Sequence, residues 1–297
     1  MSALITVKNL SKVYRLGHEK VKALDGINLE INKGEICCIL GTSGSGKSTL
    51  LNQLAGLERP TSGDVHIGKV NISRMSEDQL AGFRQRYIGF VFQSYNLLAS
   101  LTAAENVAMP LLFRGVERRH RDSEAAAMLK KVGLGNRMRH KPSEMSGGQQ
   151  QRVGIARAFV AKPKIVFADE PTGNLDSHTT IEVMNLIVDM SREHGITFVL
   201  VTHDRELSQY ANRIITLMDG QIVSDVINEK PSHLINKSNE EAPEDSPEEA
   251  AEGISPEEQE AYETSDGTVD EDSNDKEYTG EDASLPGDPG VEPEVLL

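Results

Sequence analysis

Hydrophobic residues near the start of the chain occur in short runs separated by turn-forming residues. The runs Leu4–Val7, Ile27–Ile31 and Glu35–Leu40 predict strands, with a turn at residues 32–34. A glycine-rich loop follows the third run, and the spacing of apolar residues after it predicts a helix over 47–56. The start of the chain is therefore expected to be rich in strands.

From about residue 102 to 161 the hydrophobic pattern becomes helical, and beyond it strands and helices alternate. Further strands are predicted at Asp64–Ile67, Tyr87–Phe92, Ile165–Ala168, Thr197–Val201, Arg213–Met218 and Gln221–Val226. Helices are predicted at Ala103–Leu112, Asp122–Val132, Gly148–Val160, 178–193 and 205–211. A hairpin turn is expected at residues 219–220. This order predicts an α/β fold with a parallel sheet and an inserted helical subdomain at about 94–161.

The charged residues divide the chain in two. The formal net charge is -15, but residues 231–297 hold 22 acidic residues against Lys237 and Lys276. The first 230 residues therefore carry a net charge of +5, and an ordered domain is expected over 1–230. The segment 231–297 is rich in Glu, Asp, Ser, Pro and Gly and has too few apolar residues to build a core. We expect it to be an acidic, disordered tail.

Two adjacent cysteines, Cys37 and Cys38, lie in an apolar run. Neighbouring side chains on a strand point to opposite faces, so both are predicted to be reduced core residues rather than a disulfide. The first residues lack the pattern of a secretory signal, and no apolar run reaches the roughly 18 residues that a membrane-spanning helix needs. We expect a cytoplasmic chain that reaches a membrane only from its surface.

The glycine-rich loop after residue 40 fits the phosphate-binding pattern G-x-x-x-x-G-K-[ST]. It consists of Gly41, Thr42, Ser43, Gly44, Ser45, Gly46, Lys47, Ser48 and Thr49. Small residues let successive backbone N–H groups turn toward a β-phosphate, and the helix that follows points its positive end at the same oxygens. Lys47 is expected to reach the β- and γ-phosphates, Ser48 to bind Mg²⁺ and Thr49 to contact the α-phosphate. The loop predicts that the chain binds ATP and Mg²⁺.

Two carboxylates follow the buried strand at 165–168. Asp169 is expected to be a Mg²⁺ partner, directly or through water, and Glu170 to be the general base or the group that positions the attacking water. Ligands bind at the carboxyl ends of parallel strands, which is where these two side chains lie. A pair of acids after a strand is weak evidence alone, but it gains weight from the phosphate loop that precedes it.

A third motif indicates a family. Ser146, Gly147, Gly148 and Gln149 open a helix 22 residues before Asp169, counted from Gly147. They strongly resemble the LSGGQ signature of the ABC ATPases, with Met145 where Leu is usual. The resemblance covers about residues 1–228. It implies a P-loop NTPase core of the ABC type with an N-terminal antiparallel β subdomain and an inserted helical subdomain.

The resemblance assigns three further residues. Gln93 matches the Q-loop glutamine, which takes part in catalysis and in binding Mg²⁺. His203 matches the switch histidine at the γ-phosphate, and Tyr14 matches the aromatic residue that stacks on adenine. Each has a simpler explanation: Tyr14 as a surface ring on an edge strand, and His203 as the cap of the helix after it. It is the order of all these motifs along the chain that favours the functional interpretation.

The resemblance also implies a mechanism and partners. In this family two copies face head to tail, and each ATP lies between the phosphate loop of one copy and the signature of the other. We therefore expect a homodimer that hydrolyses ATP and drives a separate integral-membrane permease from the inner face of the cell membrane, with residues 94–144 pressed against the permease. Residues 96–107 and 171–176 are similar to the macrolide-export, lipoprotein-release and cell-division branch, although Ala99 stands where that branch usually has Pro.

Two other functions are compatible with the same motor residues. Cell-division members of the branch move no substrate and signal mechanically through a membrane partner. Soluble ABC ATPases act in translation or DNA repair, but those have two cassettes or a long coiled-coil insertion, which this chain lacks. A net charge of +5 over 230 residues is also low for binding a phosphate backbone, so no nucleic-acid partner is expected.

Overall fold

A computed structural model describes residues 2–17 and 19–232, and the predicted acidic tail lies almost entirely outside these residues. The strands are β1 (Ala3–Leu16), β2 (Glu19–Asn32), β3 (Ile36–Leu40), β4 (Ser62–Ile67), β5 (Val70–Asn71), β6 (Ile88–Phe92), β7 (Ile165–Asp169), β8 (Thr197–Thr202), β9 (Arg213–Met218) and β10 (Gln221–Ile227). The helices are α1 (Lys47–Leu54), α2 (Glu77–Tyr87), α3 (Ala103–Phe113), α4 (Arg118–Lys131), α5 (Gly147–Val160), α6 (Ser177–Glu193) and α7 (Arg205–Ser208), with 3-10 turns at Ile72–Arg74 and Pro142–Glu144.

In the part of the chain that the structure describes, the strands form two sheets. One is antiparallel, with the order β2-β1-β4-β5, and the other has the order β10-β9-β3-β8-β7-β6. In the second sheet β9, β3, β8, β7 and β6 run parallel, and β10 is antiparallel to β9. Its central strands are buried on both faces, which is why they read as continuous apolar runs in the sequence. The predicted α/β class is confirmed.

The register of the parallel strands sets where the site lies. Leu40 of β3 pairs with Thr202 of β8, and Asp169 of β7 pairs with both Val201 of β8 and Phe92 of β6. Four strands therefore end at one level of the sheet. The residues that follow these ends are the ones in which the sequence places its motifs.

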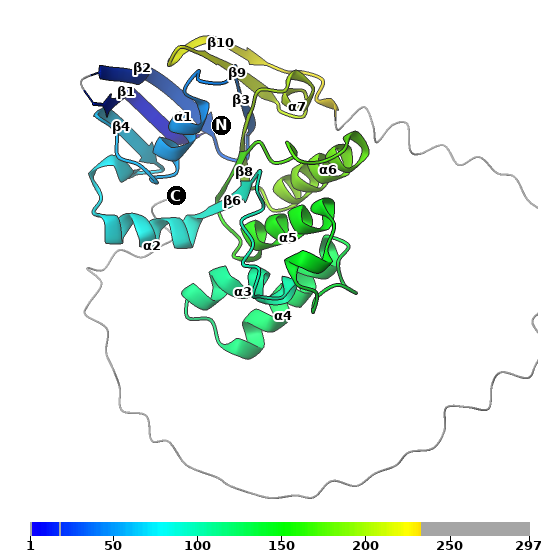
Figure 1. Ribbon diagram of the computed structural model, residues 1–297. Coiled ribbons are helices and arrows are strands. Elements are labelled where there is room, and N and C mark those ends of the chain that lie inside the picture. Colours follow the sequence, from blue (N-terminus) through cyan, green and yellow to red (C-terminus); the bar gives the residue numbers. More distant parts are fainter. Residues whose placement is uncertain (1, 18, 233–297) are drawn as a thin grey trace, which may run out of the picture. The chain divides into compact units, whose positions relative to one another are not determined.

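The main sheet separates two hydrophobic cores (Figure 1). One core packs α3, α4, α5 and α6 against one face, and the other packs α1 and the antiparallel sheet against the opposite face. Cys37 points into the second core and Cys38 into the first, both fully buried and free, as the alternation along a strand predicts. The prediction of two reduced core cysteines is confirmed.

The helices α3, α4 and α5 lie together on the side of the main sheet away from the antiparallel sheet (Figure 1). The half-buried Arg114, just after α3, ties the end of α3 to α2 and to the end of α5. Its guanidinium donates to the backbone carbonyls of Gln85, Arg86 and Ala161 at 2.6 to 2.8 Å. Burial lowers the pKa of Arg114, and the positive charge of the nearby Arg86 lowers it further.

Several elements differ from the sequence prediction: β1 and β2 are longer than the predicted strands, and β5 was not predicted. Helix α2 was not predicted because only Leu80 and Phe83 of its residues are buried, which leaves almost no apolar stripe. Its start is nevertheless marked by a capping box between Ser76 and Gln79. Helix α4 begins at Arg118 rather than residue 122, and α7 is a single turn, Arg205–Ser208.

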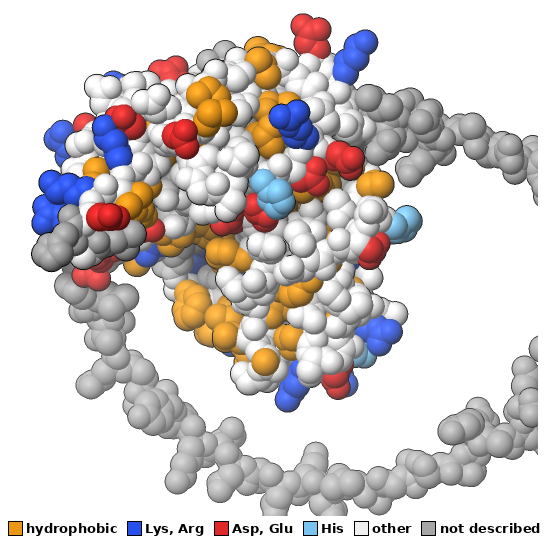
Figure 2. All heavy atoms as spheres, turned by 45° about the horizontal axis from the view of Figure 1, so that its top comes forward, with side chains coloured by type: hydrophobic (Ala, Val, Ile, Leu, Met, Phe, Trp, Pro, Cys, Tyr) orange, Lys and Arg blue, Asp and Glu red, His pale blue; other side chains and the backbone are white. Residues whose placement is uncertain are grey.

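The surface of the described residues carries charge in an uneven way. Figure 2 shows Lys and Arg side chains gathered over the antiparallel sheet, where Arg15, Lys20 and Lys22 of the β1–β2 hairpin are exposed. Among residues 2–17 and 19–232, no helix has the length and apolar character required to cross a bilayer.

Candidate functional site

The phosphate loop joins β3 to α1, and two glycines let it lie against neighbouring strands. A Cβ on Gly41 would come 2.4 Å from the carbonyl oxygen of Leu217, and one on Gly46 would come 2.4 Å from that of Ala23. Gly46 also has φ 100°, which side-chain-bearing residues rarely adopt. The loop therefore takes a shape that only glycine permits at these two positions.

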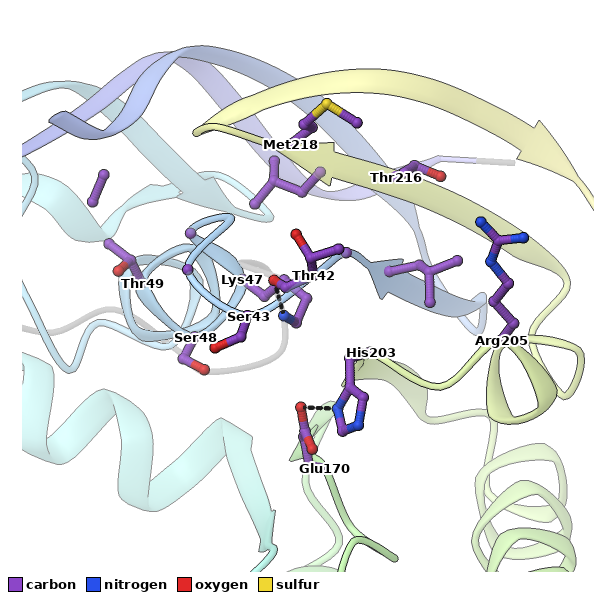
Figure 3. Close-up of a pocket in the computed structure, with 16 residues that line it drawn as sticks. Thr42, Ser43, Lys47, Ser48, Thr49, Glu170, His203, Arg205, Thr216 and Met218 are labelled. Atoms are coloured by element: carbon purple, nitrogen blue, oxygen red, sulfur yellow. Dashed lines mark hydrogen bonds and ion pairs between the residues drawn. The ribbon is translucent and has the colours of Figure 1, made fainter.

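Lys47 opens helix α1, and its side chain folds back over the loop. Its ammonium group donates to the carbonyl of Thr42 at 2.8 Å, and the residue is 6% exposed (Figure 3). Ser45 beside it is also buried, and its hydroxyl oxygen has no hydrogen-bond partner among the described residues. The loop thus holds one buried cation and several small polar residues around a concave backbone, which is an anion-binding arrangement.

Asp169 and Ser48 meet across the sheet edge. The Ser48 hydroxyl donates to Oδ1 of Asp169 at 3.4 Å, although 121 residues separate them in sequence. Burial raises the pKa of Asp169 above its ordinary value. A hydroxyl and a carboxylate side by side are the oxygen ligands that Mg²⁺ uses in phosphate sites.

Glu170 and His203 are in direct polar contact. Oε1 of Glu170 lies 2.7 Å from Nδ1 of His203, and Figure 3 shows the two side chains facing each other below Lys47. Glu170 has φ 45°, an uncommon backbone conformation for a residue other than glycine, and its N–H donates to the carbonyl of Val201. Asp204, not His203, caps α7 by accepting a hydrogen bond from the N–H of Glu206.

Gln93 follows β6 and contacts the segment after Glu170. Asn174 donates to the carbonyl of Gln93 at 3.1 Å. A Cβ on Gly173 would come 2.7 Å from Nε2 of Gln93, so the glycine makes room for the glutamine side chain. The structure therefore brings Gln93 to the same sheet edge as the residues that follow β7.

The signature residues lie at the start of α5. Ser146 is the N-cap of this helix, and it forms a capping box with Gln149. The hydroxyl of Tyr95 would be 2.8 Å from a Cβ on Gly147, so a larger residue there would displace the tyrosine. Further along α5, Arg157 donates to the carbonyls of Tyr95 and Asn96, at 2.8 and 2.5 Å.

A cavity of about 770 Å³ lies over the phosphate loop. It is lined by Ala23, Leu40, Gly41, Thr42, Ser43, Gly44, Gly46, Lys47, Ser48, Thr49, Glu170, His203, Arg205, Thr216, Leu217 and Met218. None of the signature residues lines it in the described part of the chain. Ser146, Gly148 and Gln149 instead line a separate polar cavity of about 250 Å³, together with Arg152 and Glu182. Within one copy, then, the phosphate loop and the signature do not share a site.

Comparisons with known proteins identify the family of this chain. The family model described as ABC transporter matches residues 24–173. The lipoprotein-releasing system ATP-binding protein LolD of Geobacter metallireducens is 48% identical over 225 residues, which cover 76% of this chain and 100% of that protein. The chain belongs to the ABC transporter family. It is an ATP-binding, ATP-hydrolysing subunit of the ABC type.

Two further relatives of this ABC ATPase define its branch and its fold. The macrolide export ATP-binding/permease protein MacB of Hyphomonas neptunium is 46% identical over 222 residues, which cover 75% of this chain and 34% of that protein. The dimeric structure of the ATP-binding cassette MJ0796 in a post-hydrolysis state, bound to ADP and Pi, has a TM-score of 0.70 and 42% identity, covering 76% of this chain and 99% of that one. The predicted family and its macrolide-export and lipoprotein-release branch are confirmed.

Sequence reasoning missed some residues of this ABC ATPase that the structure places at the site. Arg205 lines the large cavity on the side opposite Thr49 (Figure 3), and its position two residues after His203 was the available signal.

Tyr14 does not line this cavity. Its hydroxyl donates to Glu58 at 2.6 Å, a contact between residues 44 apart for which the sequence holds no signal.

Proposed function

We propose that this ABC ATPase works as a homodimer in which each ATP lies between the phosphate loop of one copy and the signature of the other. The observation that carries this proposal is the separation of Ser146 from the cavity over the phosphate loop within one chain. Two complementary half-sites on one molecule need a second copy to complete either of them. The dimeric state of the MJ0796 cassette supports the same arrangement.

The residues present fit both ATP and Mg²⁺. The backbone between Gly41 and Gly46 lines the large cavity and accommodates phosphate oxygens, and Lys47 neutralises part of their charge. Ser48, Asp169 and Gln93 would hold the ion, and Thr49 would contact the α-phosphate. When bound, Mg²⁺ supplies positive charge that neutralises the phosphate oxygens and orients them. The adenine would stack on the Tyr14 ring.

In the proposed reaction the chain's own groups position the water and move its proton. Glu170 accepts the proton of the attacking water, and His203 contacts the γ-phosphate while its Nδ1 side remains directed at Glu170. Gln93 lies where it can sense the γ-phosphate, because Asn174 ties its backbone to the segment after β7. Ser146 of a second copy completes the shell around the γ-phosphate. Binding of ATP therefore favours the closed dimer, and hydrolysis releases it.

A groove along the edge strand β6, between α2 and α3, is the proposed contact with a separate membrane permease. Its volume is about 390 Å³, and apolar side chains such as Phe90, Met109 and Phe113 line it beside Arg84 and Arg157. Phe113 is 65% exposed, which is unusual for a large aromatic side chain. The match to one third of a relative named as an ATP-binding/permease protein supports a membrane partner.

The remaining proposals concern the organisation of the chain. Residues 1–230 form the ATPase domain, and the helices between about 94 and 161 act as a subdomain that transmits motion to the permease. The protein works at the inner face of the cell membrane, in the macrolide-export or lipoprotein-release manner. The tail 231–297 takes no part in the chemistry.

Replacement of Lys47 tests the proposed function most directly. Wild-type protein should retain Mg-ATP and hydrolyse it, and EDTA should abolish turnover. Lys47→Ala should lose ATP binding and hydrolysis, whereas Lys162→Ala, which removes an exposed lysine that pairs with Glu124, should behave as wild type. Undiminished turnover by Lys47→Ala, measured as phosphate release, would refute the proposal.

A further inference from the structure

Glu58 lies in the turn after α1. Its carboxylate accepts hydrogen bonds from two side chains and forms an ion pair with a third. The Tyr14 hydroxyl donates to its Oε2 at 2.6 Å, the Asn52 amide donates to its Oε1 at 3.0 Å, and the Lys12 ammonium lies 3.2 Å from Oε2. Although burial raises the pKa of Glu58, the bonds from these three groups lower it below its ordinary value. The carboxylate is therefore ionised and can only accept, which makes the Tyr14 hydroxyl the donor.

The position of Glu58 is itself fixed by helix α1. The backbone N–H groups of Leu57 and Glu58 both donate to the carbonyl of Asn52, at 2.8 and 3.3 Å. Asn52 lies three residues after Thr49, on the same face of the helix that starts at the phosphate loop. Burial and the hydrogen bond with Glu58 raise the pKa of the Tyr14 phenol, although the nearby Thr49 side chain lowers it. Tyr14 is thus anchored to the same helix that opens with Lys47.

One face of the Tyr14 ring is already occupied. The Lys12 ammonium lies 5.1 Å from the ring centroid, and the carbonyl of Arg59 accepts from it at 2.7 Å. A flat ligand group therefore has only the opposite face on which to stack. An aromatic ring held by its hydroxyl on one side and by a cation on another has a defined plane, as a stacking platform requires.

We propose that Glu58 is a positioning residue for nucleoside binding: it fixes the Tyr14 ring, relative to the phosphate loop, in the orientation that presents the face opposite Lys12 to the base. This inference rests on the proposed role of Tyr14 as the platform for adenine. Glu58 does not touch the nucleotide itself. It contributes to binding of the nucleoside part of the ligand and leaves binding of the phosphates unchanged.

Binding of Mg-ADP and of Mg-pyrophosphate to the full-length protein separates these contributions. Neither ligand supports hydrolysis, and pyrophosphate lacks the base. Tyr14→Ala should weaken ADP about tenfold, as the loss of one stacked base predicts, and leave pyrophosphate unchanged. Glu58→Ala should weaken ADP about threefold to tenfold, again with pyrophosphate unchanged. Glu58→Gln should retain part of the affinity, since an amide oxygen still accepts from the phenol.

A double-mutant cycle shows whether Glu58 acts through Tyr14. In a Tyr14→Phe background, Glu58→Ala should cause no further loss of ADP affinity. Glu77→Gln is the matched control, because it removes a carboxylate that pairs with the neighbouring Arg59 at 3.0 Å, and it should bind both ligands as wild type does. Equal weakening of ADP and pyrophosphate by Glu58→Ala and Glu58→Gln, or fully additive losses in the cycle, would overturn the proposal. If Tyr14→Ala binds ADP with wild-type affinity, Tyr14 is not the stacking platform for adenine, and the proposed role of Glu58 fails with it.

Discussion

Oε1 of Glu170 and Nδ1 of His203 lie 2.7 Å apart, and this contact joins the ends of two neighbouring strands. The parallel register of β7 and β8 brings the two residues together, since Asp169 pairs with Val201. Nδ1 of the imidazole faces the Glu170 carboxylate, which leaves Nε2 directed away from Glu170. The pair can thus serve the water on one side and the γ-phosphate on the other.

Glu170→Gln should bind ATP but hydrolyse it about a hundredfold more slowly or worse, because the amide cannot accept the proton of the attacking water. The variant should accumulate as an ATP-bound dimer in size-exclusion chromatography. Phosphate release measures the rate, and Glu193→Gln, which removes a surface carboxylate paired with Lys131, provides the control. Hydrolysis at the wild-type rate would show that Glu170 is not the base.

Arg157→Lys should uncouple nucleotide binding from turnover. The guanidinium holds the carbonyls of Tyr95 and Asn96, whose φ angles of 58° and 49° are uncommon, close to Gln93. A lysine has no planar fork to reproduce both bonds, so the segment after Gln93 should loosen. We expect kcat to fall several-fold with unchanged affinity for Mg-ADP. A fall in affinity of the same size as the fall in kcat would contradict this role.

The two cysteines should be unreactive in the folded protein. Both are fully buried, and burial raises the pKa of Cys37 and raises the pKa of Cys38 to about 12, so neither is a thiolate near neutral pH. Iodoacetamide at pH 8 should add no mass to the native protein and two labels after denaturation in guanidinium. Mass spectrometry measures both states. Labelling of the native protein at the rate of a free thiol would show that this strand opens.

The ion pair between Arg213 and Asp225 should contribute to stability in a pH-dependent way. Arg213 bonds Asp225 at 2.6 Å and lowers the pKa of this carboxyl. A lowered pKa means that the contribution is present above the ordinary carboxyl pKa of about 4 and is lost as pH falls through the lowered value. Because Asp225 is partly exposed, we expect Asp225→Asn to cost under about 1 kcal/mol of unfolding free energy at pH 7. In urea titrations its difference from wild type should shrink toward pH 2.

Deletion of residues 235–297 should leave ATP hydrolysis largely intact, because every motif that carries chemistry lies before residue 231. The truncated and full-length proteins should release phosphate at similar rates under the same conditions. A large loss of activity in the truncated protein would assign the acidic segment a role in the reaction.

The sequence alone predicted most strands, most helices and the glycine-rich loop between β3 and α1. These features are local: the phosphate loop is a run of nine residues, and a strand buried on both faces is recognised by its continuous apolar run. Helix α2 was missed because its stability depends on Leu80 and Phe83 and on a cap rather than on an apolar stripe. Predictions succeeded where a short pattern is sufficient to define the element.

The tertiary structure alone decided which distant side chains meet. The bonds of Tyr14 with Glu58 and of Arg157 with Asn96 join residues 44 and 61 positions apart, and neither follows from any spacing in the sequence. Such contacts depend on strand register and on how each helix packs against the sheet, which the whole core determines together. The sequence therefore determined the chemistry that this protein carries, and the packing of its two cores decided how those groups are positioned.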